Sequence, residues 1–124
     1  MGLDMYAYKT PRTTDATPVD YKIPKKGSAE LHYWRKHADL HGWMQALYFE
    51  KGGADPQFNL ASVELDETDL DRLERDIQAV HSPETLGFFF GETDESEKED
   101  DLDFITNARA ALNEGFLVYY SAWW

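Results

Sequence analysis

The chain has 124 residues, no cysteine and a formal net charge of −12 at pH 7, and 42% of its residues are hydrophobic. This length and composition favour a folded chain, and we expect residues 1–124 to form a single domain with a buried core. The lack of cysteine excludes a disulfide framework and a thiolate zinc site. No apolar run approaches the ~20 residues of a membrane span, and the first ten residues lack the pattern of a secretory signal. We therefore predict a cytoplasmic protein with no membrane association.

The charge is unevenly distributed along the chain. Residues 1–36 hold seven Lys and Arg against four acids, a net of +3, whereas residues 37–124 hold five bases against twenty acids, a net of −15. Such an acidic surface repels nucleic acid, so no direct nucleic-acid binding is expected. It can instead bind a basic protein surface or imitate a polyanion. The alternative is that the acids only keep the protein in solution.

The first half of the chain predicts one strand, an irregular segment and two helices. "GLDMYAYKT" alternates in hydropathy, as an opening strand does. Residues 10–28 contain three prolines and predict an ordered loop or edge strand, with "VDYKI" as its one short pairing segment. Ser28 can cap a short helix that runs to about Lys36, and Asp39 can cap a second helix that Gly52-Gly53 ends. The apolar positions of that second helix are Leu40, Trp43, Met44, Leu47 and Tyr48.

The second half predicts three strands and two helices. "FNLASVEL" and the "FFF" of residues 88–90 read as strands, the latter as a buried central one. "DETDLDRLERDIQAV" predicts a helix with Asp66 as its N-cap and an apolar stripe. A second helix is expected from about Asp101 to Glu114, and "FLVYYSAWW" as a closing strand. The expected stripes are Leu70, Leu73, Ile77 and Val80, then Leu102, Ile105, Ala108 and Leu112.

These elements together predict the α+β class. We expect a two-layer domain in which three to four helices cover a mainly antiparallel sheet of about four to five strands. No internal repeat is present, and no linker divides the chain.

The densest group of chemically active side chains is "LHYWRKHADLHGW", residues 31–43. His37 and His41 lie four apart, which is the spacing of two zinc ligands on a helix. Ala38, however, stands where a zinc protease motif has its glutamate, and an N-cap at Asp39 leaves His37 outside the helix. We therefore predict no metal. His32, His37 and His41 remain weak candidates for the base of a small hydrolase or transferase.

The same stretch contains an island of positive charge in an acidic protein. Trp34, Arg35, Lys36 and His37 are the candidate ligand-binding residues, suited to a small anion such as a nucleotide. The alternative is that these cations pair with the protein's own acids. No nucleophile motif or glycine-rich phosphate loop supports a reaction, and no cofactor is predicted. The serines that could serve as nucleophiles are Ser62, Ser82, Ser96 and Ser121, and none of them lies in a recognisable turn motif.

"ETDESEKEDDLD", residues 92–103, is the most acidic segment, with eight acids and one lysine. Its spacing does not fit a calcium loop. It is either a solvated loop that leads into a helix N-terminus, where negative charge is favourable, or a protein-binding surface. Strand alternation sends Trp123 and Trp124 to opposite faces, so one of them can be exposed. The candidate partner-binding residues are Glu92, Asp94, Glu95, Glu97, Glu99, Asp100 and Trp124.

Four segments carry a resemblance: "MGLDMY", "HYWRKHADLHGW", "GFFFG" and "YYSAWW". Together they resemble an uncharacterised family of small proteins carried by phages and bacterial mobile elements, along most of the chain. The resemblance implies a context, since small acidic phage proteins often inhibit host defence proteins or host enzymes by binding them. Together with the acidic surface, it leads us to expect an anti-defence inhibitor whose partner is a host defence or nucleic-acid-handling protein with a basic surface. The alternative functions are a ligand-binding module that uses residues 31–43 and a small histidine-dependent hydrolase. A homodimer is compatible with each of these functions.

Overall fold

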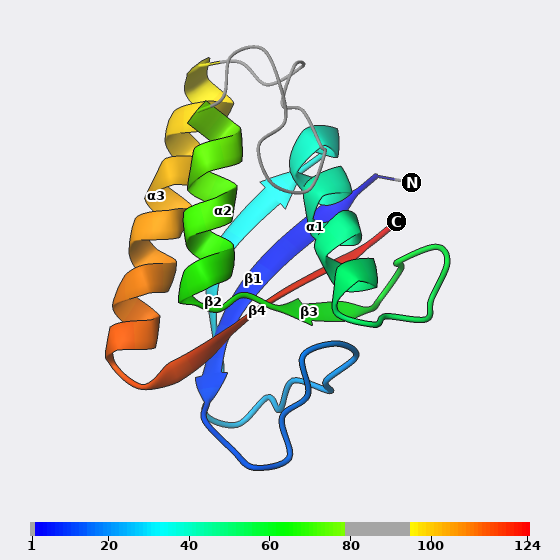
Figure 1. Cartoon of the computed structure of the whole chain (residues 1–124), viewed down its shortest axis with the longest axis vertical. Helices are drawn as coiled ribbons and strands as arrows, with labels where there is room; N and C mark the ends of the chain where they lie inside the picture. The colour runs from blue at the N-terminus through cyan, green and yellow to red at the C-terminus, as the bar shows by residue number, and fades with distance from the viewer. Residues whose placement is uncertain (1, 79–94) are drawn as a thin grey trace.

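The computed structural model describes residues 2–78 and 95–124. These residues form four strands and three helices (Figure 1). In chain order they are β1 (Asp4–Pro11), β2 (Ala29–Arg35), α1 (Ala38–Glu50), β3 (Ser62–Glu64), α2 (Glu67–Gln78), α3 (Glu95–Asn113) and β4 (Phe116–Trp123).

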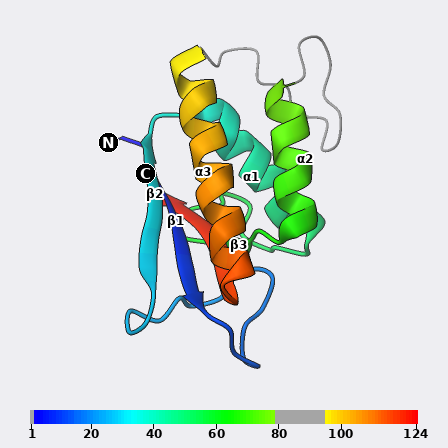
Figure 2. The ribbon, with the colours of Figure 1, turned by 90° about the vertical axis from the view of Figure 1, so that its left-hand side faces the viewer.

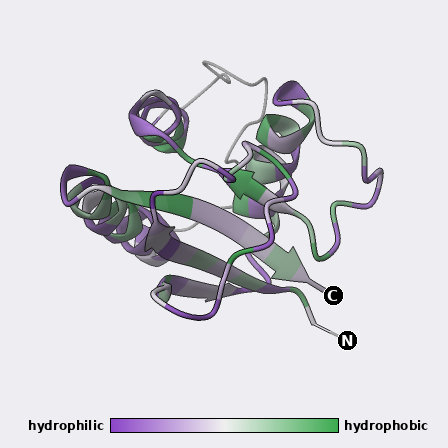
Figure 3. Ribbon diagram, turned by 90° about the horizontal axis from the view of Figure 1, so that it is seen from below, coloured by the Kyte–Doolittle hydropathy of each residue, from purple (hydrophilic) through white to green (hydrophobic). Residues whose placement is uncertain are grey.

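The four strands form one antiparallel sheet in the order β2-β1-β4-β3. β1 and β4 pair along their full length, from Asp4 opposite Trp123 to Pro11 opposite Phe116. The three helices lie on one face of this sheet, and no helix covers the other face within the described residues (Figures 2 and 3). The predicted two-layer α+β architecture is therefore confirmed.

The core lies between the sheet and the helices, and strand alternation selects its members. Met5 and Ala7 of β1 and Val118 and Tyr120 of β4 point to the helices and are fully buried. Their neighbours in the sequence point to the open face of the sheet. The largest buried side chains from the helices are Trp43, Tyr48, Phe104, Leu40, Met44, Leu47 and Leu70.

One predicted helix is wrong. Residues 28–36 were expected to be helical, but Ala29–Arg35 is strand β2, paired with β1 from Asp4 opposite Arg35 to Lys9 opposite Ala29. The pairing shifts register between Ala7 and Tyr8, so one extra residue of β2 interrupts the alternation that would identify a strand in the sequence. Aromatic residues favour strands, and pairing with β1 decides the outcome.

Three other boundaries also differ. α1 begins at Ala38 with His37 at its N-cap, so Asp39 lies inside the first turn rather than at the cap. "FNLASVEL" contributes only Ser62–Glu64 as strand, because Phe58 and Leu60 adopt left-handed backbone conformations that interrupt an extended chain. α3 begins at Glu95 rather than near Asp101, so most of the expected acidic loop is helix. The strand predicted at residues 88–90 lies outside the described residues.

Other expectations are confirmed. Residues 4–11 and 116–123 are strands, and Val19 of the "VDYKI" segment bridges Val63 beside β3. α2 follows Asp66, whose carboxylate accepts a hydrogen bond from the Asp69 backbone N–H at 2.9 Å. In return the Asp69 carboxylate accepts the Asp66 backbone N–H at 3.0 Å, the reciprocal pattern of a capping box. None of the helices in the described part of the chain combines the length and hydropathy that a membrane crossing needs.

Candidate functional site

The predicted ligand-binding stretch is joined to α3 through one buried carboxylate, that of Asp101. Trp34 Nε1 donates to Asp101 Oδ1 at 3.0 Å, and His37 Nε2 lies 2.7 Å from Asp101 Oδ2. Asp101 is completely buried, and Trp34 and His37 are only 4% exposed. Phe104, one turn after Asp101, packs its ring edge-on to Trp34 with centroids 4.8 Å apart. Asp101 therefore ties the end of β2 and the start of α1 to α3.

Further contacts extend this junction to its exposed rim. His32 Nε2 lies 2.9 Å from Asp100 Oδ2, and His37 Nδ1 lies 3.6 Å from Glu97 Oε2. The two segments that the sequence presented as separate candidate sites, residues 31–43 and 92–103, thus meet. Arg35 and Lys36 are exposed, and within the described residues neither side chain forms an ion pair. The sequence left internal pairing open as an alternative, and among the described residues it occurs for the histidines and not for these two cations.

Burial and charge act in opposite directions on the pair at the centre. Burial lowers the pKa of His37, but its hydrogen bond to Asp101 and the negative charges of Asp101, Glu97 and Asp39 raise that pKa by more, so it lies above the ordinary histidine value. Burial raises the pKa of Asp101 by more than the hydrogen bonds from His37 and Trp34 lower it. The pair therefore holds its proton more readily than either group does in water.

This geometry favours a structural role for His37. A histidine base needs one ring nitrogen directed at a nucleophile while the other is oriented by a carboxylate. In His37 both ring nitrogens face carboxylates, those of Asp101 and Glu97. In the part of the chain that the structure describes, no three His, Asp or Glu side chains are arranged to hold a metal ion.

His41 lies in a different environment, on the inner side of α1. Its Nδ1 is 2.8 Å from the hydroxyl oxygen of Tyr120, and its ring stacks on Phe58 with centroids 5.2 Å apart. Trp124 packs edge-on to the same ring at 4.9 Å. Burial lowers the pKa of His41 to about 4, so the ring is neutral at pH 7. Trp124 is 38% exposed and Trp123 is 50% exposed, so neither terminal tryptophan is a core residue.

The acidic start of α3 presents a stripe of three exposed carboxylates. Glu95, Glu99 and Asp103 lie four residues apart, and four-residue spacing places side chains on one side of a helix. Within the described residues none of the three forms an ion pair. Glu97 and Asp100, also predicted as partner-binding, instead face His37 and His32. Glu92 and Asp94 lie outside the described residues.

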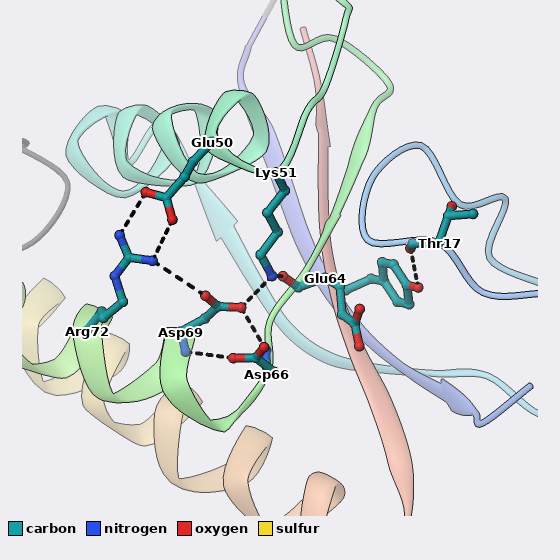
Figure 4. Close-up of polar contacts among 8 residues, drawn as sticks. Thr17, Glu50, Lys51, Glu64, Asp66, Asp69 and Arg72 are labelled. Atoms are coloured by element: carbon teal, nitrogen blue, oxygen red, sulfur yellow. Dashed lines mark hydrogen bonds and ion pairs between the residues drawn. The ribbon is translucent and has the colours of Figure 1, made fainter.

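Several acids elsewhere in the helical layer are paired with Lys51, Arg72 or Arg109. Arg72 binds both carboxylate oxygens of Glu50, at 2.8 and 2.9 Å, and the Lys51 ammonium contacts the buried Asp69 carboxylate (Figure 4). Arg109 binds Asp71 at 2.7 Å and Glu74 at 3.1 Å. The same figure shows Lys51 between Asp69 and the backbone oxygen of Glu64, where it joins the end of α1 to the start of α2.

Sequence reasoning missed two features of this surface. It placed Asp101 only near a helix start and gave it no part in a site, because a carboxylate inside an acidic run resembles its solvated neighbours. The structure makes Asp101 the buried centre of the junction. It also omitted Asp103, for which a signal was present: Glu95, Glu99 and Asp103 recur every four residues once the segment is taken as helix.

Comparisons with known proteins add no relative. No family model matches the chain, and neither a curated protein nor a solved structure matches it.

Proposed function

We propose that this protein acts by binding rather than by catalysis, and that it engages a basic surface on another protein through the stripe Glu95, Glu99 and Asp103 of α3. The observation that carries the proposal is that these three carboxylates are exposed and form no ion pair within the described residues. By contrast, Asp71 and Glu74 of α2 are paired with Arg109.

The stripe is unfavourable for the isolated helix. Like charges four residues apart destabilise a helix by about 0.2–0.5 kcal/mol per pair. Attraction to the helix dipole is confined to the first turn, so it offsets this cost for Glu95 but not for Glu99 or Asp103. A partner with Lys or Arg opposite the stripe would convert the repulsion into attraction. A row of regularly spaced carboxylates on a protein surface can also imitate the phosphates of a nucleic-acid backbone.

The class of partner follows from that chemistry and from the resemblance to phage-borne proteins. Proteins that handle nucleic acid carry basic surfaces, because phosphate binding requires Lys and Arg. We therefore propose a host defence protein or another nucleic-acid-handling protein as the target, which this chain would block by occupying its phosphate-binding surface.

Neutralising the stripe tests the proposal. In Glu95→Gln/Glu99→Gln/Asp103→Asn we expect association with the partner to slow about tenfold or more, with a smaller change in dissociation, because rim charges act mainly on encounter. Capture of bacterial proteins by the wild type should weaken as salt rises from 0.1 to 1 M, since the Debye length falls from about 10 to about 3 Å. Capture and mass spectrometry would identify the partner, and surface plasmon resonance would give both rates.

A matched variant separates the position of the charges from their number. Asp15→Asn/Glu67→Gln/Glu114→Gln removes three exposed acids that lie outside the stripe, so its net charge equals that of the stripe variant. We expect it to associate nearly as fast as the wild type. If association slows equally in both variants, the acids act through the net charge of the protein and not through their position in the stripe. The proposal is contradicted if capture does not depend on salt and the stripe variant captures the partner as well as the wild type does.

A further inference from the structure

The open face of the sheet carries a groove that the acidic surface does not involve. The groove has a volume of about 480 Å³ and lies between residues 21–30 and the strands. No described helix covers this face, and residues 12–28 run along its lower end (Figures 1 and 2). Cavities of roughly 300–1,000 Å³ are the usual size of small-molecule sites. The groove is therefore large enough for a ligand of nucleotide size.

The wall formed by residues 21–25 is fixed to the sheet. Ser62 Oγ donates to the backbone oxygen of Tyr21 at 2.9 Å, and the Tyr21 ring packs on Tyr119 with centroids 5.1 Å apart. Tyr119 in turn donates its hydroxyl to the backbone oxygen of Thr17 at 2.6 Å. Tyr8 from β1 and Tyr21 line the groove, so aromatic rings are present on both the sheet and the wall. A ligand therefore meets a largely preformed site.

Leu60 provides a second, independent observation. It lines the groove and is 75% exposed, more than any other large hydrophobic residue in the described part of the chain. Its backbone has φ +63°, a left-handed conformation that is rare for a bulky residue. The left-handed backbone costs free energy, and strained backbone of this kind concentrates at ligand sites. An apolar ligand body against Leu60 would remove its side chain from water.

The groove is cationic although the protein as a whole is strongly acidic. Lys22 and Lys25 line it, and within the described residues neither forms an ion pair with a carboxylate. Glu30 is the one acid among the lining residues, so the lining carries a net charge of +1. The two ammonium groups can bind an anionic group, and the Glu30 carboxylate can accept a hydrogen bond from an amino or hydroxyl group on the ligand.

We propose that this groove binds a small phosphate ester with a planar aromatic body, of the class to which nucleoside monophosphates belong. Tyr8, Tyr21 and Leu60 would contact the aromatic body, and Lys22 and Lys25 would bind the phosphate. A longer nucleic acid is disfavoured, because the net charge of −12 repels a polyanion that extends beyond the groove. The site differs from residues 34–37, in which the sequence placed a ligand.

Titration followed by two-dimensional NMR tests the site with defined probes. AMP and 1-naphthyl phosphate each combine an aromatic body with a phosphate, whereas adenosine and inorganic phosphate supply one part only. We expect both aromatic phosphates to shift the amide signals of residues that line the groove. Adenosine and inorganic phosphate should each bind at least tenfold more weakly. Binding of AMP but not of 1-naphthyl phosphate would restrict the class to nucleotides, and the reverse result would exclude nucleotides from it.

Charge variants supply the control. In Lys22→Ala/Lys25→Ala the affinity for the aromatic phosphates should fall at least tenfold, whereas Lys26→Ala, which removes a neighbouring exposed lysine that does not line the groove, should change it less than twofold. All these lysines are exposed, so the fold should be retained. The proposal is overturned if neither aromatic phosphate shifts groove signals at millimolar concentration, or if the double variant binds as tightly as the wild type.

Discussion

Replacing Asp101 by Ala should lower the free energy of unfolding by about 3–5 kcal/mol, the cost of removing one member of a buried charged or hydrogen-bonded group. Asp101 is completely buried and serves two donors, Trp34 Nε1 at 3.0 Å and His37 Nε2 at 2.7 Å. The variant leaves Trp34 Nε1 without its acceptor and removes a contact between α3 and the β2–α1 corner. Because domains of this size are stable by only about 5–15 kcal/mol, urea unfolding should show a much lower midpoint.

Two further variants identify the cause of that loss. Asp101→Asn retains an amide oxygen for Trp34 but removes the negative charge, so we expect it to lose about half as much stability as Asp101→Ala. It should also lower the pKa of His37, which NMR titration of the ring would report. Asp103→Ala, two residues along the same helix and exposed, should change stability by less than about 0.5 kcal/mol. If Asp101→Ala unfolds at the same urea concentration as the wild type, the junction does not hold α3 to the sheet.

The sequence predicted most of the fold where hydrophobic periodicity was regular. The alternation of residues 4–10 and the stripe of Leu70, Leu73 and Ile77 correspond to β1 and α2, since each element buries one side. The failure at residues 28–36 has a physical cause. Among the described residues β2 is an edge strand with a register shift, so its burial does not alternate. A chain with Ser28 before a polar and aromatic run also resembles a capped helix.

The candidate site was harder to predict because it depends on contacts between distant segments. Trp34 and His37 meet Asp101 across more than sixty residues, and a single sequence contains no record of that distance. The composition did indicate that the cations of residues 31–43 could pair with the many acids of the chain. Such internal ion pairs were therefore the alternative to a ligand site. The groove on the open face was not anticipated, since Lys22, Lys25 and Leu60 come from irregular segments whose paths no periodicity predicts.

Acidification should destabilise the protein through His41, and the sign follows from its depressed pKa. In the folded protein burial lowers the pKa of His41 to about 4, whereas in the unfolded chain it is near 6.5. Between these values the unfolded state binds more protons, so stability falls as pH falls from 6.5 to 4 and is then constant. The neutral ring can accept the Tyr120 hydroxyl proton at Nδ1 over 2.8 Å, and protonation would reverse this bond, so that Nδ1 donates to the hydroxyl oxygen. We expect a loss of about 3 kcal/mol across this window from His41.

Comparison with His41→Asn isolates that contribution from the many carboxylates that titrate in the same range. Asparagine can place its amide near the Tyr120 hydroxyl and does not titrate, so the difference in unfolding free energy between wild type and variant should shrink from pH 7 to pH 4. His37 does not confound the measurement. Its pKa is raised, so its contribution is complete below pH 6.5 and is lost only as pH rises through its folded-state value. Urea unfolding of both proteins at half-unit pH intervals gives the two curves. Parallel curves from pH 7 to pH 4 would show that His41 is not kept neutral by burial, and that the contacts of its ring with Phe58 and Trp124 tolerate a charge.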